Sequence, residues 1–570
     1  MSGQPYAEPA AAAPVLEATG ESKIDEKHLE HDVNALSVDK NDIIVDGSRS
    51  AGLAVIEQIQ VIPKTGKRIP TSRWEYITFC LYYFANNGAP IGGNGGALRQ
   101  ALLSQANPSG IVHWGGQVLT LNALLLDISG ILFAVQAFIL LFIGPFADYG
   151  RWRGYILTVA QVILWIMQFS LVGIHKPSQW QIANGIYIVG SLAANISVAF
   201  YQATFPALVR DLPKIIQSEN EVRQGLKSPE EHERLDQYER AQLYNMSNIT
   251  GSALVVVTYA ISIGISYALG YGSDATLIHS YNILLAYFGA ITVLCTLPFL
   301  ILQKHRPGQA LPEGVSFWTA GPRQVWSATK HARHLKHCML YLVAWCCLQE
   351  SWGTWYTIVG ILQNEVIDYS PLKLNALSMV ADLGGGSGTV MMYLLQKRYR
   401  FSIQTALRYG AIMTVLPCLY GGIGMFTHAF GFHHSWEFWI ASSWNFMTGC
   451  WGAYSVSMIS EVVPAPKLML FFAMFNIWGK TSGFLGPFIT SAIIERAHGN
   501  TNAAFWFLFA LGTIGVTVLW QVNTDQAKLD NAAYLEREAQ EMYSQEQRRQ
   551  GAEFIATGDE EFAAQHKAQP

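Results

Sequence analysis

Two long apolar stretches, residues 119–142 and 155–174, are separated by little more than the polar turn GPFADYGRWR at 144–153. An α-helix rises about 1.5 Å per residue, so each stretch is long enough to cross a hydrocarbon layer of about 30 Å. The pair therefore predicts two membrane-spanning helices that are joined by a short charged turn.

The composition extends this prediction to the whole chain. Of its 570 residues, 51% are hydrophobic and 14% are charged, which is too apolar for an ordinary soluble protein and typical of a membrane protein with many spans. The net charge of -4 provides no basic field for a nucleic acid. The seven cysteines lie in or beside apolar segments, without the spacing of a metal site. We therefore expect no nucleic-acid partner, no metal and no cofactor.

Windows of about 19 residues mark twelve apolar segments. They lie near 74–93, 119–143, 154–175, 181–205, 247–269, 280–303, 338–362, 372–395, 406–428, 436–460, 468–494 and 502–521. Lysine and arginine gather in the loops 206–245 and 304–337 and directly after the eighth segment. Positively charged loops stay in the cytosol, so both termini are predicted to be cytosolic. No cleavable signal peptide is expected, and the first span targets the membrane.

The basic loop at 304–337 divides the twelve segments into two groups of six. This division predicts an all-α membrane protein with the major-facilitator fold, twelve transmembrane helices in two six-helix halves. The expected parts are a disordered cytosolic arm at 1–72, an N-terminal bundle at 73–303, the central loop at 304–337, a C-terminal bundle at 338–521 and a cytosolic tail at 522–570. Such a fold moves a solute, so we expect a transporter rather than an enzyme.

The turn at 144–153 is a candidate cytosolic gate. Gly144 allows close helix packing, Asp148 places an anion beside helix ends, and Gly150 allows a tight reversal. Arg151 and Arg153 can pair across the two halves, which would hold one access state closed. The alternative is that the two arginines only enforce the topology.

Glu350 is the clearest ionisable residue at membrane depth, where a charge is costly and so indicates function. It lies about twelve residues into its apolar segment, roughly 18 Å along a helix and near the bilayer midplane. The residues that share its helix face are Trp345, Gln349, Trp352 and Tyr356. This face predicts a wall for an organic solute, with Glu350 as the coupling or substrate-contacting carboxylate. The alternative is a glutamate that is hydrogen-bonded to a neighbouring helix.

Three further charged residues fall within predicted spans. Asp127 and Asp382 lie at related places in the two halves, and Lys480 lies in the eleventh segment. Carboxyl groups at such depth can carry a proton from an acidic compartment to the cytosol. Lys480 is interpreted as a counter-ion to one of these acids or as a side chain that reaches the cytosolic interface.

Two glycine-rich runs interrupt predicted spans. The run that begins at Asn86 and Asn87 and ends at Gly96 also contains a proline, so it cannot hold a regular helix. Unwound backbone there would offer amides and carbonyls to a zwitterion, and the alternative is an ordinary helix end. The run GGGSG at 384–388 allows the same two interpretations, with close helix packing favoured.

Several segments resemble the autophagy-related protein 22 family of fungal vacuolar amino-acid effluxers. They are the turn at 144–153, the loop 206–245, the sequence HRPGQ at 305–309 and SEVVPAPKLMLFFAMFNIWGKTSGFLGPFITSAI at 460–493. The resemblance runs from about residue 73 to residue 521, and the first span departs from the family pattern. It implies a permease of the vacuolar membrane that exports leucine and other neutral amino acids released by autophagic degradation.

Two other functions stay open at the level of the sequence. One is a plasma-membrane permease for another small solute, and the other is a transporter-like sensor that uses its cytosolic loops as output. The expected partners of the preferred function are amino-acid substrates, protons and the lipid bilayer, and the chain is expected to be a monomer.

Overall fold

The computed structural model describes residues 69–537, except 88–91, 271–272, 307, 309–315, 334, 465–470, 472–473, 476–477 and 480–482, and also describes Gln540 and Ser544. The side chains of some residues in helices, including Asn86, Asn87 and Asp148, also lie outside this description. The predicted arm at 1–72 is therefore largely outside the described residues, and the chain is mainly helical, as the apolar segments predict.

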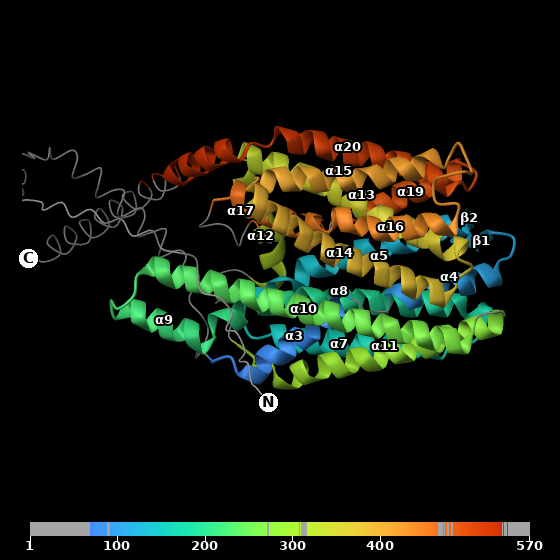
Figure 1. The fold of residues 1–570 in the computed structure, drawn as a ribbon, viewed down its shortest axis with the longest axis horizontal. Coiled ribbons are helices and arrows are strands. Elements are labelled where there is room, and N and C mark those ends of the chain that lie inside the picture. Colours follow the sequence, from blue (N-terminus) through green and yellow to red (C-terminus); the bar gives the residue numbers. More distant parts are fainter. Residues whose placement is uncertain are drawn as a thin grey trace, which may run out of the picture. The chain divides into compact units, whose positions relative to one another are not determined.

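The first group of helices runs from α3 to α11 (Figure 1), and we call it the N-terminal half. Its helices are α3 (Arg73–Asn87), α4 (Gly92–Ala106), α5 (Leu121–Ile143), α6 (Pro145–Asp148), α7 (Arg153–Val172), α8 (Trp180–Arg210), α9 (Pro213–Arg223), α10 (Pro229–Leu269) and α11 (Asp274–Leu302). An antiparallel hairpin of β1 (Ile111–Trp114) and β2 (Gln117–Thr120), which was not predicted from the sequence, precedes α5. The 3-10 turn η1 (Pro177–Gln179) leads into α8.

The second group, which we call the C-terminal half, runs from α13 to α20 and follows the central-loop helix α12 (Phe317–Ala332). Its helices are α13 (Lys336–Val366), α14 (Pro371–Tyr399), α15 (Ile403–Ile423), α16 (Ser435–Thr448), α17 (Cys450–Val462), α19 (Leu485–Arg496) and α20 (Ala504–Gln521), with the 3-10 turn η3 (Thr501–Ala503) before α20. The predicted span at 436–460 is thus divided into α16 and α17 at Gly449.

Seven helical stretches of the described residues are long and apolar enough to cross a membrane, judged by length and composition. They are Leu121–Ile143, Arg153–Val172, Pro177–Arg210, Arg234–Leu269, Asp274–Leu302, Ile403–Ile423 and Thr501–Gln521. The other predicted spans fall on helices that are interrupted, less apolar or incompletely described. The total of twelve transmembrane helices therefore stays a prediction.

The glycine-rich run after Asn87 was predicted to be unable to hold a regular helix, and this prediction is wrong for its second part. Residues 92–96 form the first turn of α4, while 88–91 lie outside the described residues. Each glycine costs a helix about 1 kcal/mol relative to alanine. Burial of the α4 face that carries Ala97, Leu98 and Leu102, each 0% exposed, offsets this cost, because tertiary packing overrides local propensity.

The second glycine run, at 384–388, allows close helix packing, as was expected. A Cβ atom at Gly388 of α14 would clash with the backbone carbonyl of Phe446 in α16. The hydroxyl of Thr389 also donates to the carbonyl oxygen of Gly449 at 2.8 Å. Small residues therefore let the backbones of α14 and α16 touch.

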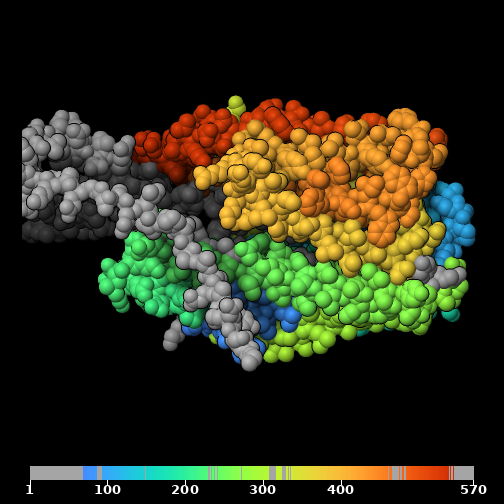
Figure 2. Space-filling view, in the orientation of Figure 1, coloured from blue at the N-terminus to red at the C-terminus, as the bar shows by residue number. Residues whose placement is uncertain are grey.

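The helices pack mainly within each half. In the N-terminal half α7 packs on α8, and α3 packs on α10 and α11; in the C-terminal half α13 packs on α20, and α14 packs on α16. Between the halves, α5 packs on α19 and α10 packs on α14. Figure 2 shows the green surface of α10 adjoining the yellow surface of α14.

The two ends of the helix bundle carry different structures. We call the end that carries β1 and β2 the hairpin end, and the opposite end, with α9 and the basic loops 206–245 and 304–337, the basic end (Figure 1). The loop charges predict that the basic end faces the cytosol.

Candidate substrate pathway and its two ends

At the hairpin end the two halves are joined by direct hydrogen bonds between α5 and the helices α13, α19 and η3. The backbone N–H and the hydroxyl of Thr120 both donate to Glu495 Oε1, at 2.6 and 2.8 Å. The side-chain amide of Asn122 donates to Glu365 Oε2 at 3.4 Å and to the hydroxyl of Thr501 at 3.1 Å. The start of α5 is therefore clasped by polar groups of the other half.

Buried amides continue this connection between α4 and the C-terminal half. Gln100 Nε2 donates to the carbonyl oxygen of Ile361, and Asn364 Nδ2 donates to Gln100 Oε1, both at 2.9 Å. Asn94 Nδ2 donates to Asn375 Oδ1 at 3.2 Å. A buried polar group that loses its partner costs about 1–3 kcal/mol. These bonds therefore hold the hairpin end closed, since separating the halves would leave several amides unpaired until water reached them.

The basic end is organised differently. The hydrogen bonds that join β2, α4, α5 and α11 to the C-terminal half lie at the hairpin end. At the basic end a buried ion pair lies within the N-terminal half instead. Arg306 donates to both carboxylate oxygens of Glu75, at 2.6 and 2.8 Å, and its Nε lies 3.1 Å from Asp211 Oδ2. The pair ties the exit of α11 to the beginning of α3 and the end of α8.

This ion-pair network was not predicted from the sequence, where Arg306 is one of several basic residues of a predicted cytosolic loop and Glu75 lies 231 residues away. Glu75 and Asp211 are 0% exposed and Arg306 is 7% exposed. The available signal was Glu75 itself, a carboxylate in the first turn of an apolar segment. A buried charge of this kind requires a partner.

The turn at 144–153 contacts itself and the central loop in this structure. Gly150 has a φ of +73°, the left-handed conformation that a glycine adopts readily, and its carbonyl accepts from the N–H of Gly308 at 2.7 Å. Arg153 Nε donates to the carbonyl oxygen of Ala147 at 2.6 Å, and Arg151 is exposed. Gly144 joins α5 to α6, while the side chain of Asp148 lies outside the described residues. Pairing of this turn across the halves stays a prediction.

Glu350 lies inside the C-terminal half, 6% exposed. Its Oε1 accepts a hydrogen bond from the backbone N–H of Gly486, in the first turn of α19, where the orphan N–H groups and the helix dipole favour a carboxylate. A Cβ atom at Gly486 would clash with Glu350 and with the hydroxyl of Thr354. This arrangement matches the alternative that the sequence left open, a glutamate bound to a neighbouring helix.

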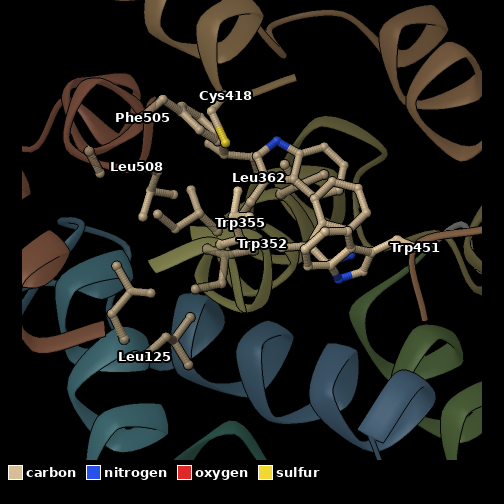
Figure 3. Close-up of a cluster of buried hydrophobic side chains, with 14 of the residues drawn as sticks. Leu125, Trp352, Trp355, Leu362, Cys418, Trp451, Phe505 and Leu508 are labelled. Atoms are coloured by element: carbon tan, nitrogen blue, oxygen red, sulfur yellow. The ribbon is translucent and has the colours of Figure 1, made fainter. Parts of the chain in front are cut away.

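The aromatic residues near Glu350 pack against other aromatics (Figure 3). Trp352, 9% exposed, stacks on Trp355 with ring centroids 4.8 Å apart, and Trp345 stacks on Trp451 at 5.7 Å. The predicted wall at Trp352 is thus part of the core here. Gln349, one turn from Trp345, is half-buried beside Gly479.

Asp382 occupies a more open position than Glu350. Its side chain is exposed, and Tyr259 of α10 and Tyr356 of α13 lie within range of an electrostatic interaction with its carboxyl group. Tyr356 is 45% exposed and donates to Asn445 Oδ1 of α16. One tyrosine from each half therefore lies near Asp382, which stays exposed.

Asp127 lies elsewhere, near the hairpin end. Its carboxyl group neighbours Ser491 and Glu495 of α19, so the structure does not bring Asp127, Glu350 and Asp382 together into one site. Lys480 lies outside the described residues, as do the side chains of Asn86 and Asn87, and the roles predicted for these three residues stay predictions.

The sequence matches the family model described as "Vacuole effluxer Atg22 like" over residues 71–532. Two curated relatives are each named Autophagy-related protein 22. The one from Chaetomium globosum is 25% identical over 456 residues, which is 69% of this chain and 68% of the relative. The one from Pyricularia oryzae is 24% identical over 445 residues, which is 70% of this chain and 64% of the relative. The matched region thus spans about two thirds of each relative.

One solved structure supports the fold. The crystal structure of a D-xylose-proton symporter has a TM-score of 0.51 and 13% sequence identity to this chain, and covers 78% of this chain and 96% of that chain. At this identity the likeness supports the fold alone, and it agrees with the major-facilitator architecture predicted from the spacing of the apolar segments.

Proposed function

Because the chain belongs to the family of Atg22-like vacuole effluxers, we propose that it exports leucine and other neutral amino acids from the vacuole lumen to the cytosol. Alternating access is the proposed mechanism. In this proposal the basic end and both termini face the cytosol, and the hairpin end faces the lumen.

The mechanistic part of the proposal rests on one observation, which is that hydrogen bonds join the two halves at the hairpin end. The hydrogen bonds of Thr120, Asn122 and Gln100 close the hairpin end, and each joins one half to the other. A transporter that opens alternately to two sides needs contacts of this kind, which break when the halves rotate. The structure then corresponds to a state that is closed toward the lumen.

Asp382 is the carboxylate that the geometry favours for contact with the solute or with a coupled proton. Its side chain is exposed, and it interacts electrostatically with Tyr259 of the N-terminal half and Tyr356 of the C-terminal half. Hydroxyl, amide and carboxylate groups can together bind the ammonium and carboxylate groups of an amino acid. Glu350 is instead assigned to holding the first turn of α19, because its carboxylate accepts from the N–H of Gly486.

The test uses purified protein in lipid vesicles that contain radiolabelled leucine, with an acidic compartment on the hairpin side. The Asp382→Asn variant should no longer move leucine in response to the pH gradient. It should still exchange leucine across the membrane when the pH is equal on both sides. A carboxylate that meets the acidic side in one state and the neutral side in the other carries the proton, and an amide cannot.

Glu350→Gln is the matched variant, because its amide oxygen still accepts the hydrogen bond from Gly486. It should keep the pH dependence of the unmodified protein. If Glu350→Gln lost the response to the pH gradient and Asp382→Asn kept it, Glu350 would be the residue that carries the proton. Absence of leucine flux through the unmodified protein under every gradient would contradict the proposed transport of leucine.

A further inference from the structure

The central-loop helix α12 docks on the N-terminal half through one face. The ring of Phe317 stacks on Phe146 of α6, with centroids 4.8 Å apart and an interplanar angle of 17°. Ala320 is 5% exposed. A Cβ atom at Gly321 would clash with the carbonyl oxygen of Leu141, so this glycine lets α12 approach the end of α5 closely. The helix is thereby fixed at the basic end, where the spans α5 and α7 meet their connecting turn.

The opposite face of α12 exposes Trp326 among basic residues, while Trp318 lies on the flank of the helix, where its ring also contacts Phe146 with ring centroids 5.7 Å apart. Trp318 is 60% exposed and Trp326 is 70% exposed, and Arg323, Lys330 and Arg333 are also exposed. At about 100° per residue, Trp326, Lys330 and Arg333 fall on the side of the helix opposite Phe317. The exposed face is therefore aromatic and cationic at once.

A small cavity lies on this face. It has a volume of about 250 Å³ and is lined by Trp326, Thr329, Lys330 and Arg333. An indole, a hydroxyl, an ammonium and a guanidinium group thus border one space. Lysine and arginine donate to phosphate oxygens.

These features fit a lipid surface better than bulk water. Tryptophan prefers the level of the lipid headgroups, where its ring meets both apolar and polar surroundings. An amphipathic helix with tryptophan and basic residues lies in the plane of the membrane interface, and α12 sits where the end of α5 reaches that interface. Its positive charges complement anionic lipids.

We propose that α12 lies in the membrane interface at the basic end and that the cavity beside Trp326, Lys330 and Arg333 binds the headgroup of an anionic phospholipid. The phosphate accepts from Lys330 and Arg333, and the glycerol region packs against the indole of Trp326. Because α12 also packs on Phe146, the bound lipid steadies the turn at 144–153 from outside the transport pathway.

The experiment measures lipids that stay bound to the purified full-length protein. Protein is exchanged into nanodiscs of phosphatidylcholine with or without phosphatidylserine, extracted gently, and weighed by native mass spectrometry. Each basic residue near an anionic surface adds about 1 kcal/mol of attraction, so losing two should weaken retention by on the order of ten- to thirtyfold. The double variant Lys330→Gln and Arg333→Gln should therefore lose a retained phosphatidylserine and keep its phosphatidylcholine.

Two controls separate the proposal from general surface charge and from misfolding. The pair Lys397→Gln and Arg398→Gln removes two exposed charges at the same end of the bundle, and it should retain phosphatidylserine normally. The charge-preserving pair Lys330→Arg and Arg333→Lys should do the same.

The proposal would be overturned if the Lys330→Gln, Arg333→Gln variant and the Lys397→Gln, Arg398→Gln variant lost phosphatidylserine equally. It would also be overturned if both variants retained phosphatidylserine. A third arm adds inorganic phosphate to protein in phosphatidylcholine alone. Phosphate binding that disappears in the Lys330→Gln and Arg333→Gln variant would mean that the cavity takes a soluble anion, and it would also overturn the lipid assignment.

Discussion

The hairpin end and the basic end of this bundle are held by different chemistry. At the hairpin end, amides and hydroxyls of the N-terminal half bond to amides, carbonyls and the carboxylates Glu365 and Glu495 of the other half. At the basic end, the buried charges of Arg306, Glu75 and Asp211 stay within one half. The first set of bonds must break if the halves separate, whereas the second set is untouched by such a motion.

This difference indicates that the hairpin end is a gate, which opens and closes between the halves. The ion pair of Arg306 at the basic end is a brace, which stays intact within one half. Single hydrogen bonds contribute about 0.5–1.5 kcal/mol each, so a gate made of them can open when solute or protons shift the balance by a few kcal/mol. A buried ion pair is costly to break, about 3–5 kcal/mol when one partner is removed. Such a pair suits the rigid part of a half that moves as one body.

The largest effect is expected from breaking the brace. Arg306→Ala leaves the buried charge of Glu75 without its ion-pair partner, while Asp211 keeps its ion pair with Arg210, so we expect a loss of about 3–5 kcal/mol in stability. Thermal unfolding of the detergent-solubilised protein, followed by size-exclusion chromatography, measures this change. Lys528→Ala is the control, because its ion pair with Glu461 has a lysine side chain that is 61% exposed, and exposed pairs contribute only about 0–1 kcal/mol. Equal losses in both variants would remove the distinction between brace and surface pair.

An intermediate effect is expected from weakening the gate. Glu495→Ala removes the acceptor of both hydrogen bonds from Thr120, and hydrogen bonds to charged groups contribute about 1.5–3 kcal/mol. We expect the open population to rise about tenfold or more, read as faster thiol labelling of a cysteine at Ala123, which is 0% exposed. Asn282→Ala serves as the control, because Asn282 bonds to Ile174 and His175 within one half. An unchanged labelling rate in Glu495→Ala would refute the gate.

The smallest effect on solute binding is expected at the basic end. Asp148→Asn combined with Arg151→Ala alters the connecting turn, which lies away from Asp382, so the affinity for the solute should stay within a few-fold, or about 1 kcal/mol. Transport should nevertheless slow, since the turn governs exchange between states. Equilibrium binding and flux are measured on the same preparation. A loss of affinity in proportion to the loss of flux would place the turn in the binding site instead.

The sequence predicted the helical membrane fold because long apolar segments leave little choice of structure. It also drew attention to Asp382 and Glu350, since charges at membrane depth stand out in an apolar background, and their roles stay predictions. It could not assign their surroundings, because the N–H of Gly486 and the ring of Trp355 reach these regions only through tertiary packing. The bonds of Thr120, Asn122 and Gln100 were missed for a similar reason, as neutral polar residues near helix ends carry no distinctive pattern. The helix at 92–106 was missed because local glycine content opposed the packing that prevailed.

If the hairpin end must open for transport, a reversible cross-link across that end should block transport, and this is the most direct experiment. Cysteines at Thr120 and Glu495, whose side chains are in hydrogen-bond contact, are joined in vesicles by an oxidant or a short bifunctional reagent. We expect leucine flux to stop when the cross-link forms and to return when a disulfide is reduced. A cross-link between cysteines at Asn282 and His175, which lies within one half, should leave the flux unchanged. Normal flux through protein that is fully cross-linked between positions 120 and 495 would show that the hairpin end need not open for transport.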